Sequence, residues 1–409
     1  MKLAKRITIG LACMSAPALA FESTKVLPKG VRNITFKNVF TNSENRTDGN
    51  GNVEALSDPL AQDLTFKRII DGEKDPIKKD LLKSLLLTEE DLSQEDFMGT
   101  FTADLKANIH VFAPVMAMGI TDKITLAVAL PYYDVSTDAR VGFNPNNRTA
   151  AKFLGLLTSP SLNQPAEAQE AWGKINNAVG ELQQKLTDNG FQNIDTWREQ
   201  GFGDITLAVK QLAYNPGPYA IATTYGLVLP TGRRDDPDIL TDLPFGDGQT
   251  DAFFQVTADE FLPYGVVLNQ YAKYTYQAPG HRTIRMATLE EKIQVDKMEA
   301  DFKLGDKIDA GAAILHETFD GIGTGLGVVY FRKFADKYDV PNEVRQELEK
   351  YSDQELISAE AQLGYSTVAA FQRGDFAIPF SVALNYKRHL SSKNQPVTDL
   401  ITVDMNMYF

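Results

Sequence analysis

Residues 401–409 read ITVDMNMYF. Apolar and polar side chains alternate along the whole stretch, and the last residue is aromatic. Successive side chains of an extended strand point to opposite faces, so one face here carries Ile401, Val403, Met405, Met407 and Phe409. Most soluble chains end instead in a polar, frayed tail. The stretch therefore predicts a strand at the very end of the chain, with one face fully apolar.

The same two-residue period recurs along the chain. It is longest from Ala103 to Ala117, and it returns over 376–387 and 204–210. A soluble sandwich rarely needs a strand of about fifteen residues, whereas a tilted membrane strand needs about 9 to 11 plus its extensions. Weaker alternation marks 31–41, 123–133, 219–230, 251–260, 262–276, 290–304, 307–316, 324–334 and 357–370.

These strands predict an all-β fold, an antiparallel up-and-down transmembrane barrel with short turns at one end and long loops at the other. With both chain ends on one side, the strand number must be even, yet the pattern gives about thirteen. Either 324–334 lies in an external loop, which leaves twelve strands, or a strand near Leu60 to Ile70 is missing, which makes fourteen. We predict twelve. A periplasmic β-sandwich is the competing architecture, and the uninterrupted apolar parity disfavours it.

Three insertions between strands have helical spacing instead. They cover 75–87, 165–187 and 341–351, and the second repeats apolar residues from Trp172 to Leu186 before ending at Asp188-Asn189-Gly190. We expect amphipathic helices in external loops, with apolar stripes that must be buried against something.

The first twenty residues predict a secretory signal. A basic start is followed by an apolar run and by Ala18-Leu19-Ala20, so we expect cleavage after Ala20 and a single barrel domain over 21–409. A lipid anchor on Cys13 is the alternative, but the residues before it match that motif poorly. Removing three basic residues takes the net charge of -13 further negative, which argues against a nucleic-acid partner. No later run of about 18 apolar residues predicts a transmembrane helix.

No catalytic, cofactor-binding or metal-ligating motif is evident. The four histidines have no Ser/His/Asp spacing, and the glycines of Gly321 to Gly327 lack a βαβ context. The acidic stretch from Arg233 to Asp251 does not match a calcium loop, so we interpret it as a solvated external loop. A hydrolase would depend on His110 and His389.

The alternate positions of each strand that carry polar residues predict the lining of the lumen. The candidates carry both signs of charge: Asp104, Lys106, Asn108, His110, Asp204, Lys210, Lys273, Asn385, Lys387 and His389. Such charges either pair to stabilise a barrel or line a path for polar solute, and the sequence does not separate these roles.

Several short motifs carry a resemblance to a known family. Gly203-Asp204-Ile205 begins a strand, GLVLPTG at 226–232 closes the next, and GQTD at 248–251 follows an acidic loop. With MGITDKITLAVALPYY at 118–133, they resemble outer-membrane barrels grouped under the MetA pathway of phenol degradation, relatives of the long-chain fatty-acid transporters. The match is clearest over 110–276. No long N-terminal plug segment of the fatty-acid type is evident before the first strand.

The resemblance implies a monomeric barrel that passes small hydrophobic molecules through the outer membrane of a Gram-negative cell. Phe409 resembles the signal that such barrels present to the barrel assembly machinery. We predict a passive channel for hydrophobic or aromatic molecules, in contact with outer-membrane lipid and lipopolysaccharide. The alternative is a structural or surface-interaction barrel with a closed lumen. We also expect Asp404 to face the lumen, and its replacement by Leu to be tolerated for insertion.

Overall fold

The computed structural model describes residues 22–58, 60–73, 75–88, 92–160, 163–286, 296–317 and 321–409. The predicted signal at 1–20 lies outside them. Within this part of the chain, twelve antiparallel strands close into a barrel. They are β1 (Arg32–Ser43), β5 (Phe97–Thr121), β6 (Ile124–Ala129), β9 (Ile205–Tyr214), β10 (Tyr219–Leu229), β11 (Asp251–Phe261), β12 (Val266–Gln277), β15 (Lys307–Glu317), β16 (Ile322–Lys333), β18 (Gln354–Ser366), β19 (Phe380–Lys393) and β20 (Leu400–Tyr408).

Three further strands extend this wall at one end. Strand β7 (Tyr132–Pro145) follows β6 after Leu130-Pro131, and β8 (Trp197–Phe202) precedes β9 across Gly203-Asp204. Strand β7 continues the direction of β6, and β9 continues that of β8, because β5 pairs first with β6 and then with β7 along its length. Strand β4 (Gln62–Thr65) pairs with the end of β5.

The other strands form small sheets outside the ring. Strands β13 (Gly280–Arg285), β14 (Lys297–Lys303) and β17 (Lys337–Asp339) make one sheet, and β2 (Asn45–Thr47) pairs with β3 (Val53–Ala55). The prediction of twelve strands is confirmed, but the segment assigned to a loop was wrong. Residues 324–334 form β16 of the wall, whereas 297–303 of the predicted 290–304 strand lie in the outer sheet. Ile284 and Ala300 of that sheet are buried against Val344. This burial produces the same alternation of apolar and polar residues that a lipid-facing strand would have.

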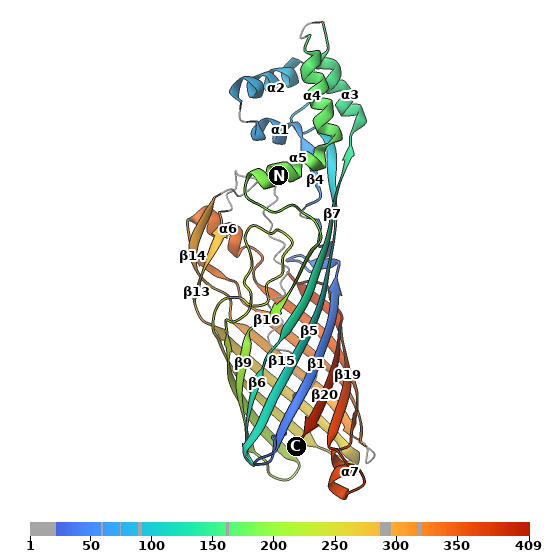
Figure 1. Ribbon diagram of the computed structural model, residues 1–409, viewed down its shortest axis with the longest axis vertical. Helices are drawn as coiled ribbons and strands as arrows, with labels where there is room; N and C mark the ends of the chain where they lie inside the picture. The colour runs from blue at the N-terminus through green and yellow to red at the C-terminus, as the bar shows by residue number, and fades with distance from the viewer. Residues whose placement is uncertain are drawn as a thin grey trace.

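Helices lie in the long connections. They are α1 (Phe66–Gly72), α2 (Pro76–Thr88), α3 (Asn147–Leu157), α4 (Pro165–Asn176), α5 (Ala178–Asp188), α6 (Asn342–Glu349), α7 (Val368–Arg373) and the short η2 (Pro263–Gly265). The three predicted insertions are confirmed as α2, α4 with α5, and α6. Figure 1 shows α1 to α5 gathered above one end of the barrel, with α7 and the C-terminus at the other. Among the described residues, no helix is long and apolar enough to cross a membrane.

Strand β20 closes the ring against β1, as its alternation predicts. Met405 and Met407 are exposed on the outer face, whereas Asp404 is 3% exposed and faces inward. Asp404 lies opposite Lys37 in the register, and the backbones of Phe409 and Arg32 exchange two hydrogen bonds. The expected tolerance of Asp404→Leu does not follow from this geometry, because the substitution would remove the counter-charge of Lys37.

The region above the ring is a folded cap rather than a set of loose loops. Leu182 and Leu186 of α5 pack with Leu243 and Phe245 of the 230–250 loop against the inner side of β5 and β7. A second cluster joins α1, α3 and α4 through Phe66, Phe153 and Ile175. The apolar stripes of these helices are thus buried in the cap.

Candidate functional site: the barrel lumen

The ring encloses a cavity of about 1510 Å³. At one end its lining includes turn and terminal residues such as Asp122, Asn215 and Tyr408, and at the other it ends at Tyr133 and Phe245. The cavity therefore runs along the lumen from the short turns to the base of the cap.

A short N-terminal segment, residues 22–28, lies inside this cavity. The backbone N–H and the hydroxyl of Thr24 both donate to Asp259 Oδ2, at 2.8 and 2.6 Å. The N–H of Leu27 donates to Thr125 Oγ1 at 2.8 Å, and Asn269 holds the other oxygen of Asp259. The sequence showed no long plug segment before the first strand; the described segment is short, and it occupies the lumen ahead of β1.

Two buried ion pairs cross between wall strands. Lys37 Nζ lies 3.7 Å from Asp404 Oδ1, and Lys307 Nζ lies 3.6 Å from Asp251 Oδ2. All four side chains are almost fully buried, so each charge depends on its partner. Asn385 adds a hydrogen bond to Asp404.

The predicted lumen residues divide into two groups, six on the inner face of the wall and four on its outer face. Asp204, Lys210 and Lys273 line the cavity. Asn385, Lys387 and His389 share the inner parity of β19, where Asn385 is buried and His389 contacts Ser392.

The other four candidates, Asp104, Lys106, Asn108 and His110, lie on the outer face of β5. Lys106 pairs with Glu44, Asn108 bonds to Asp138, and the His110 ring stacks on Phe40 at 4.5 Å. The inner face at this level is apolar, with Ala107, Ile109 and Val111 at most 5% exposed, because it packs against the cap. The polar residues of a strand mark the lumen only where lipid covers the opposite, outer face. In this part of β5 the cap covers the inner face, and the outer face is polar.

The wall is irregular where β8 meets β9. Strand β8 pairs with β7, but β10 already ends at Leu229, and residues of the 230–250 loop fill the space beside Gly203 and Asp204. A Cβ at Gly246 would lie 2.3 Å from Asp204 Oδ1, and one at Gly203 would lie 2.4 Å from Tyr133 Cε2. A side chain at either glycine would force these neighbours to shift.

An aromatic contact closes the upper end of the cavity. The rings of Tyr133 and Phe245 stack at 5.2 Å with 5° between their planes. The Arg233 guanidinium lies 5.2 Å from the Trp197 ring and 5.9 Å from Phe245. Val111 lies opposite Tyr133 in the register, and both Val111 and Leu243 belong to the apolar core of the cap. We call the Tyr133–Phe245 pair the aromatic closure.

The acidic 230–250 loop is folded rather than solvated, which corrects its interpretation from the sequence. Asp238 accepts from Arg285 Nη2 at 2.5 Å and also bonds Lys297, so the loop is tied to the outer sheet. Asp242 is 5% exposed and accepts from Arg233 at 2.6 Å. Burial and the neighbouring Asp235 carboxylate raise the pKa of Asp242 to about 7. No group of three metal-ligating side chains occurs among the described residues.

Sequence reasoning missed several lumen residues. Lys307, Asp251 and Thr275 could have been found, since each lies on the inner parity of a predicted strand. Thr24 and Phe245 carry no such signal, because each belongs to an irregular segment that tertiary contacts hold in place.

The closed ring, the apolar outer face and the internal cavity define a β-barrel of the outer-membrane type. The crystal structure of the COG4313 outer membrane channel from Pseudomonas putida F1 has this fold. Its TM-score with this chain is 0.53 at 11% identity, and the match covers 95% of this chain and 98% of that one. Residues 88–403 match the family described as "Putative MetA-pathway of phenol degradation", and the chain belongs to that family.

Among curated proteins, CCA-adding enzymes of Saccharolobus islandicus and Saccharolobus solfataricus match at 28% identity over 162 residues. The match covers 38% of this chain, which spans only 36% of the length of those relatives. A match over so small a share of either chain does not assign the activity of those enzymes to this barrel.

Proposed function

We propose that this protein is a passive outer-membrane channel for small molecules with an apolar or aromatic body. The observation that supports this most is the cavity of about 1510 Å³, whose lining runs along the lumen from the short turns to Tyr133 and Phe245 at the base of the cap. A barrel whose role is purely structural would have its lumen filled by ion pairs instead.

The chemistry of the upper end favours apolar solutes. Water and ions pay a desolvation cost to pass an apolar constriction, whereas an aromatic solute exchanges contacts with the rings that form it. Leu243, Val111 and the aromatic closure present such a surface. A solute that displaces the Phe245 ring would then enter a lumen of mixed polarity.

The test is uptake of N-phenyl-1-naphthylamine, a neutral aromatic fluorophore, into vesicles whose outer leaflet contains lipopolysaccharide. We expect purified protein to accelerate uptake over protein-free vesicles, and Phe245→Leu to accelerate it further. Trp172→Leu is the matched control, because Trp172 is 43% exposed on α4, outside the lumen. Uptake equal to that of protein-free vesicles would refute the proposal.

A further inference from the structure

One row of polar residues crosses the cavity wall at a single level. Residues directly opposite each other on neighbouring strands form the series Thr125, Lys210, Thr224, Gln255, Lys273 and Asp309. The first five line the cavity. We call this series the lysine row.

The two lysines of the row differ from the other buried lysines of the lumen. Lys37 and Lys307 have carboxylates within ion-pair distance, but among the described residues neither Lys210 nor Lys273 has one. Lys273 lies 5.1 Å from the Phe253 ring, and its register neighbour Asp309 does not reach it. With two lysines and one aspartate, the row has an excess of positive charge.

Hydroxyl and amide groups lie between these lysines. Thr224 and Gln255 separate Lys210 from Lys273 in the register, and Thr125 flanks Lys210 on the other side. The Thr125 oxygen accepts from Leu27, so its O–H proton is free to donate. Ammonium and hydroxyl donors together suit a carboxylate, which accepts several hydrogen bonds.

The neighbouring row on the wall is small and apolar. Ala127, Ala208, Gly226 and Phe253 lie opposite one another, and the Phe253 ring covers the position where Gly226 has no side chain. Ala127, Ala208 and Phe253 line the same cavity. A ligand held by the lysine row would therefore have apolar wall beside it.

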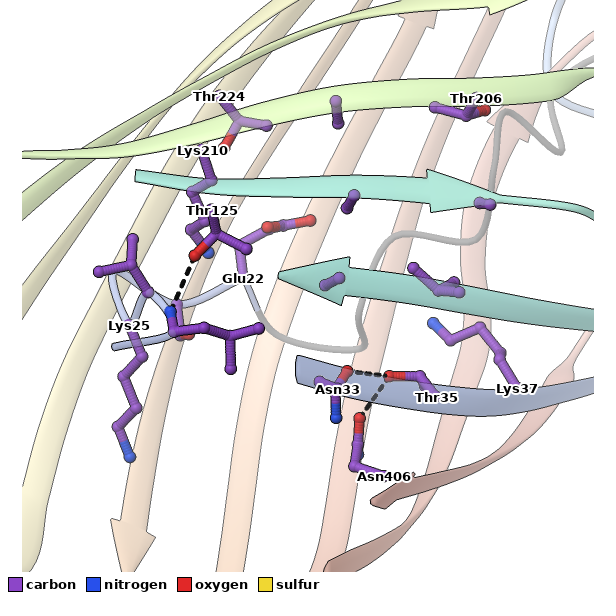
Figure 2. Close-up of a pocket in the computed structure, with 18 of the residues that line it drawn as sticks. Glu22, Lys25, Asn33, Thr35, Lys37, Thr125, Thr206, Lys210, Thr224 and Asn406 are labelled. Atoms are coloured by element: carbon purple, nitrogen blue, oxygen red, sulfur yellow. Dashed lines mark hydrogen bonds between the residues drawn. The ribbon is translucent and has the colours of Figure 1, made fainter. Parts of the chain in front are cut away.

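An internal carboxylate already lies near this position. Figure 2 shows Glu22, on the N-terminal segment, between Lys210 and Lys37. Its charge acts on both ammonium groups, yet it forms no ion pair with Lys210. The segment that carries it is held by the Thr24 and Leu27 hydrogen bonds and by an exposed Lys25–Glu317 pair.

From this geometry we infer that the lysine row binds the carboxylate of an organic anion with an apolar body, and that Glu22 competes with it for Lys210. The inference rests on the proposed channel function and narrows its solutes. Glu22 is thus a specificity-determining residue: its charge weakens the preference of the lysine row for anions, and removal of that charge strengthens this preference.

The experiment measures block of single-channel current by benzoate and by benzamide, its neutral analogue, with purified protein in planar bilayers at neutral pH. We expect benzoate to block more strongly than benzamide. In Glu22→Gln, benzoate affinity should rise on the order of tenfold, as expected for loss of one partly exposed charge competitor. In the double variant Lys210→Gln/Lys273→Gln, the two compounds should block alike.

Matched controls are Lys123→Gln and Glu199→Gln, whose side chains are exposed and do not line the cavity. Heat-modifiable mobility on gels checks that each variant folds, and single lysine variants replace the double variant if it fails to insert. Stronger benzoate block that survives the lysine substitutions, or an unchanged affinity in Glu22→Gln, would overturn the inference. If the fluorophore is taken up but benzoate and benzamide block equally, only this inference is overturned. If the protein gives no uptake, the proposed function is overturned.

Discussion

The two halves of strand β5 can be compared on a single outer face. From Asp104 to His110 the outward residues are polar, and from Phe112 to Ile120 they are apolar, with Met116 48% exposed. The inward residues are apolar in both halves, but the upper ones pack against the cap and the lower ones line the cavity. The two-residue alternation thus occurs both in the part of the strand within the membrane and in the part outside it. Only the polarity of the outward side chains distinguishes the two parts.

The largest effect should come from the lower, polar part of the lumen. Lys37→Met removes the buried partner of Asp404, and an uncompensated buried charge costs about 3 to 5 kcal/mol. We expect this loss in the free energy of unfolding, measured by denaturant titration in lipid vesicles. The double variant Lys37→Met/Asp404→Leu should recover most of the stability. Equal stability of Lys37→Met and the wild type would mean that the pair is not desolvated.

The comparison along β5 gives the next effect. Met116→Lys puts a charge on the apolar outer face, which costs about 2 to 4 kcal/mol near the middle of a bilayer. Asn108→Lys changes the same face of the same strand, where Asp138 is close, and should change stability by less than about 0.5 kcal/mol. Unfolding titrations of the two variants check this. Similar losses for both would place Asn108 in lipid and contradict the boundary near His110.

A smaller effect on stability, with a larger one on permeation, is expected at the aromatic closure. Phe245→Leu keeps an apolar side chain but loses the stack on Tyr133, at a cost of about 1 kcal/mol. Single-channel conductance should rise, because the smaller side chain leaves more space at the upper end of the cavity. If conductance is unchanged while stability falls, the constriction lies elsewhere in the cap.

The smallest effect is a pH dependence of the cap. Asp242 has a folded pKa of about 7, above its ordinary value of 3.8, so the folded cap binds a proton that the opened cap releases. Its contribution is therefore complete in acid and is lost as pH rises from about 4 to about 7. Hydrogen exchange in residues 231–250, corrected for intrinsic rates, should show more opening at pH 7.5 than at pH 5.

Asp242→Asn should remove this difference, because the amide does not titrate. The exposed Asp195→Asn should keep it. A cap that opens equally at both pH values in the wild type would show that Arg233 holds Asp242 ionised throughout.

The barrel itself could be predicted from sequence, because lipid on the outer face imposes alternation along whole strands. Strand β20 follows this rule closely, and Met405 and Asp404 lie on the faces that their parity indicates. The rule fails where something other than lipid covers a strand. The cap buries Ile109 on the inner face of β5, so the next residue, His110, faces outward. The small outer sheet buries Ala300 and so produces the same alternation without lipid.

The site was less predictable than the wall. Lys210 and Lys273 follow from parity alone. The N-terminal segment and Phe245 do not, since their positions depend on contacts with residues far away in the chain. Thr24, for example, is held by Asp259, and Phe245 packs on Tyr133. Local sequence carries no record of such partners.

The most direct test of the central claim is to fix the aromatic closure. Cysteines replace Tyr133 and Phe245 in a chain whose one native cysteine, Cys13, lies in the predicted signal, and a short bismaleimide joins them. We predict that cross-linking lowers uptake of N-phenyl-1-naphthylamine to the level of protein-free vesicles, and that the reagent does not lower uptake in either single cysteine variant. Undiminished uptake through the cross-linked protein would contradict a path through this contact.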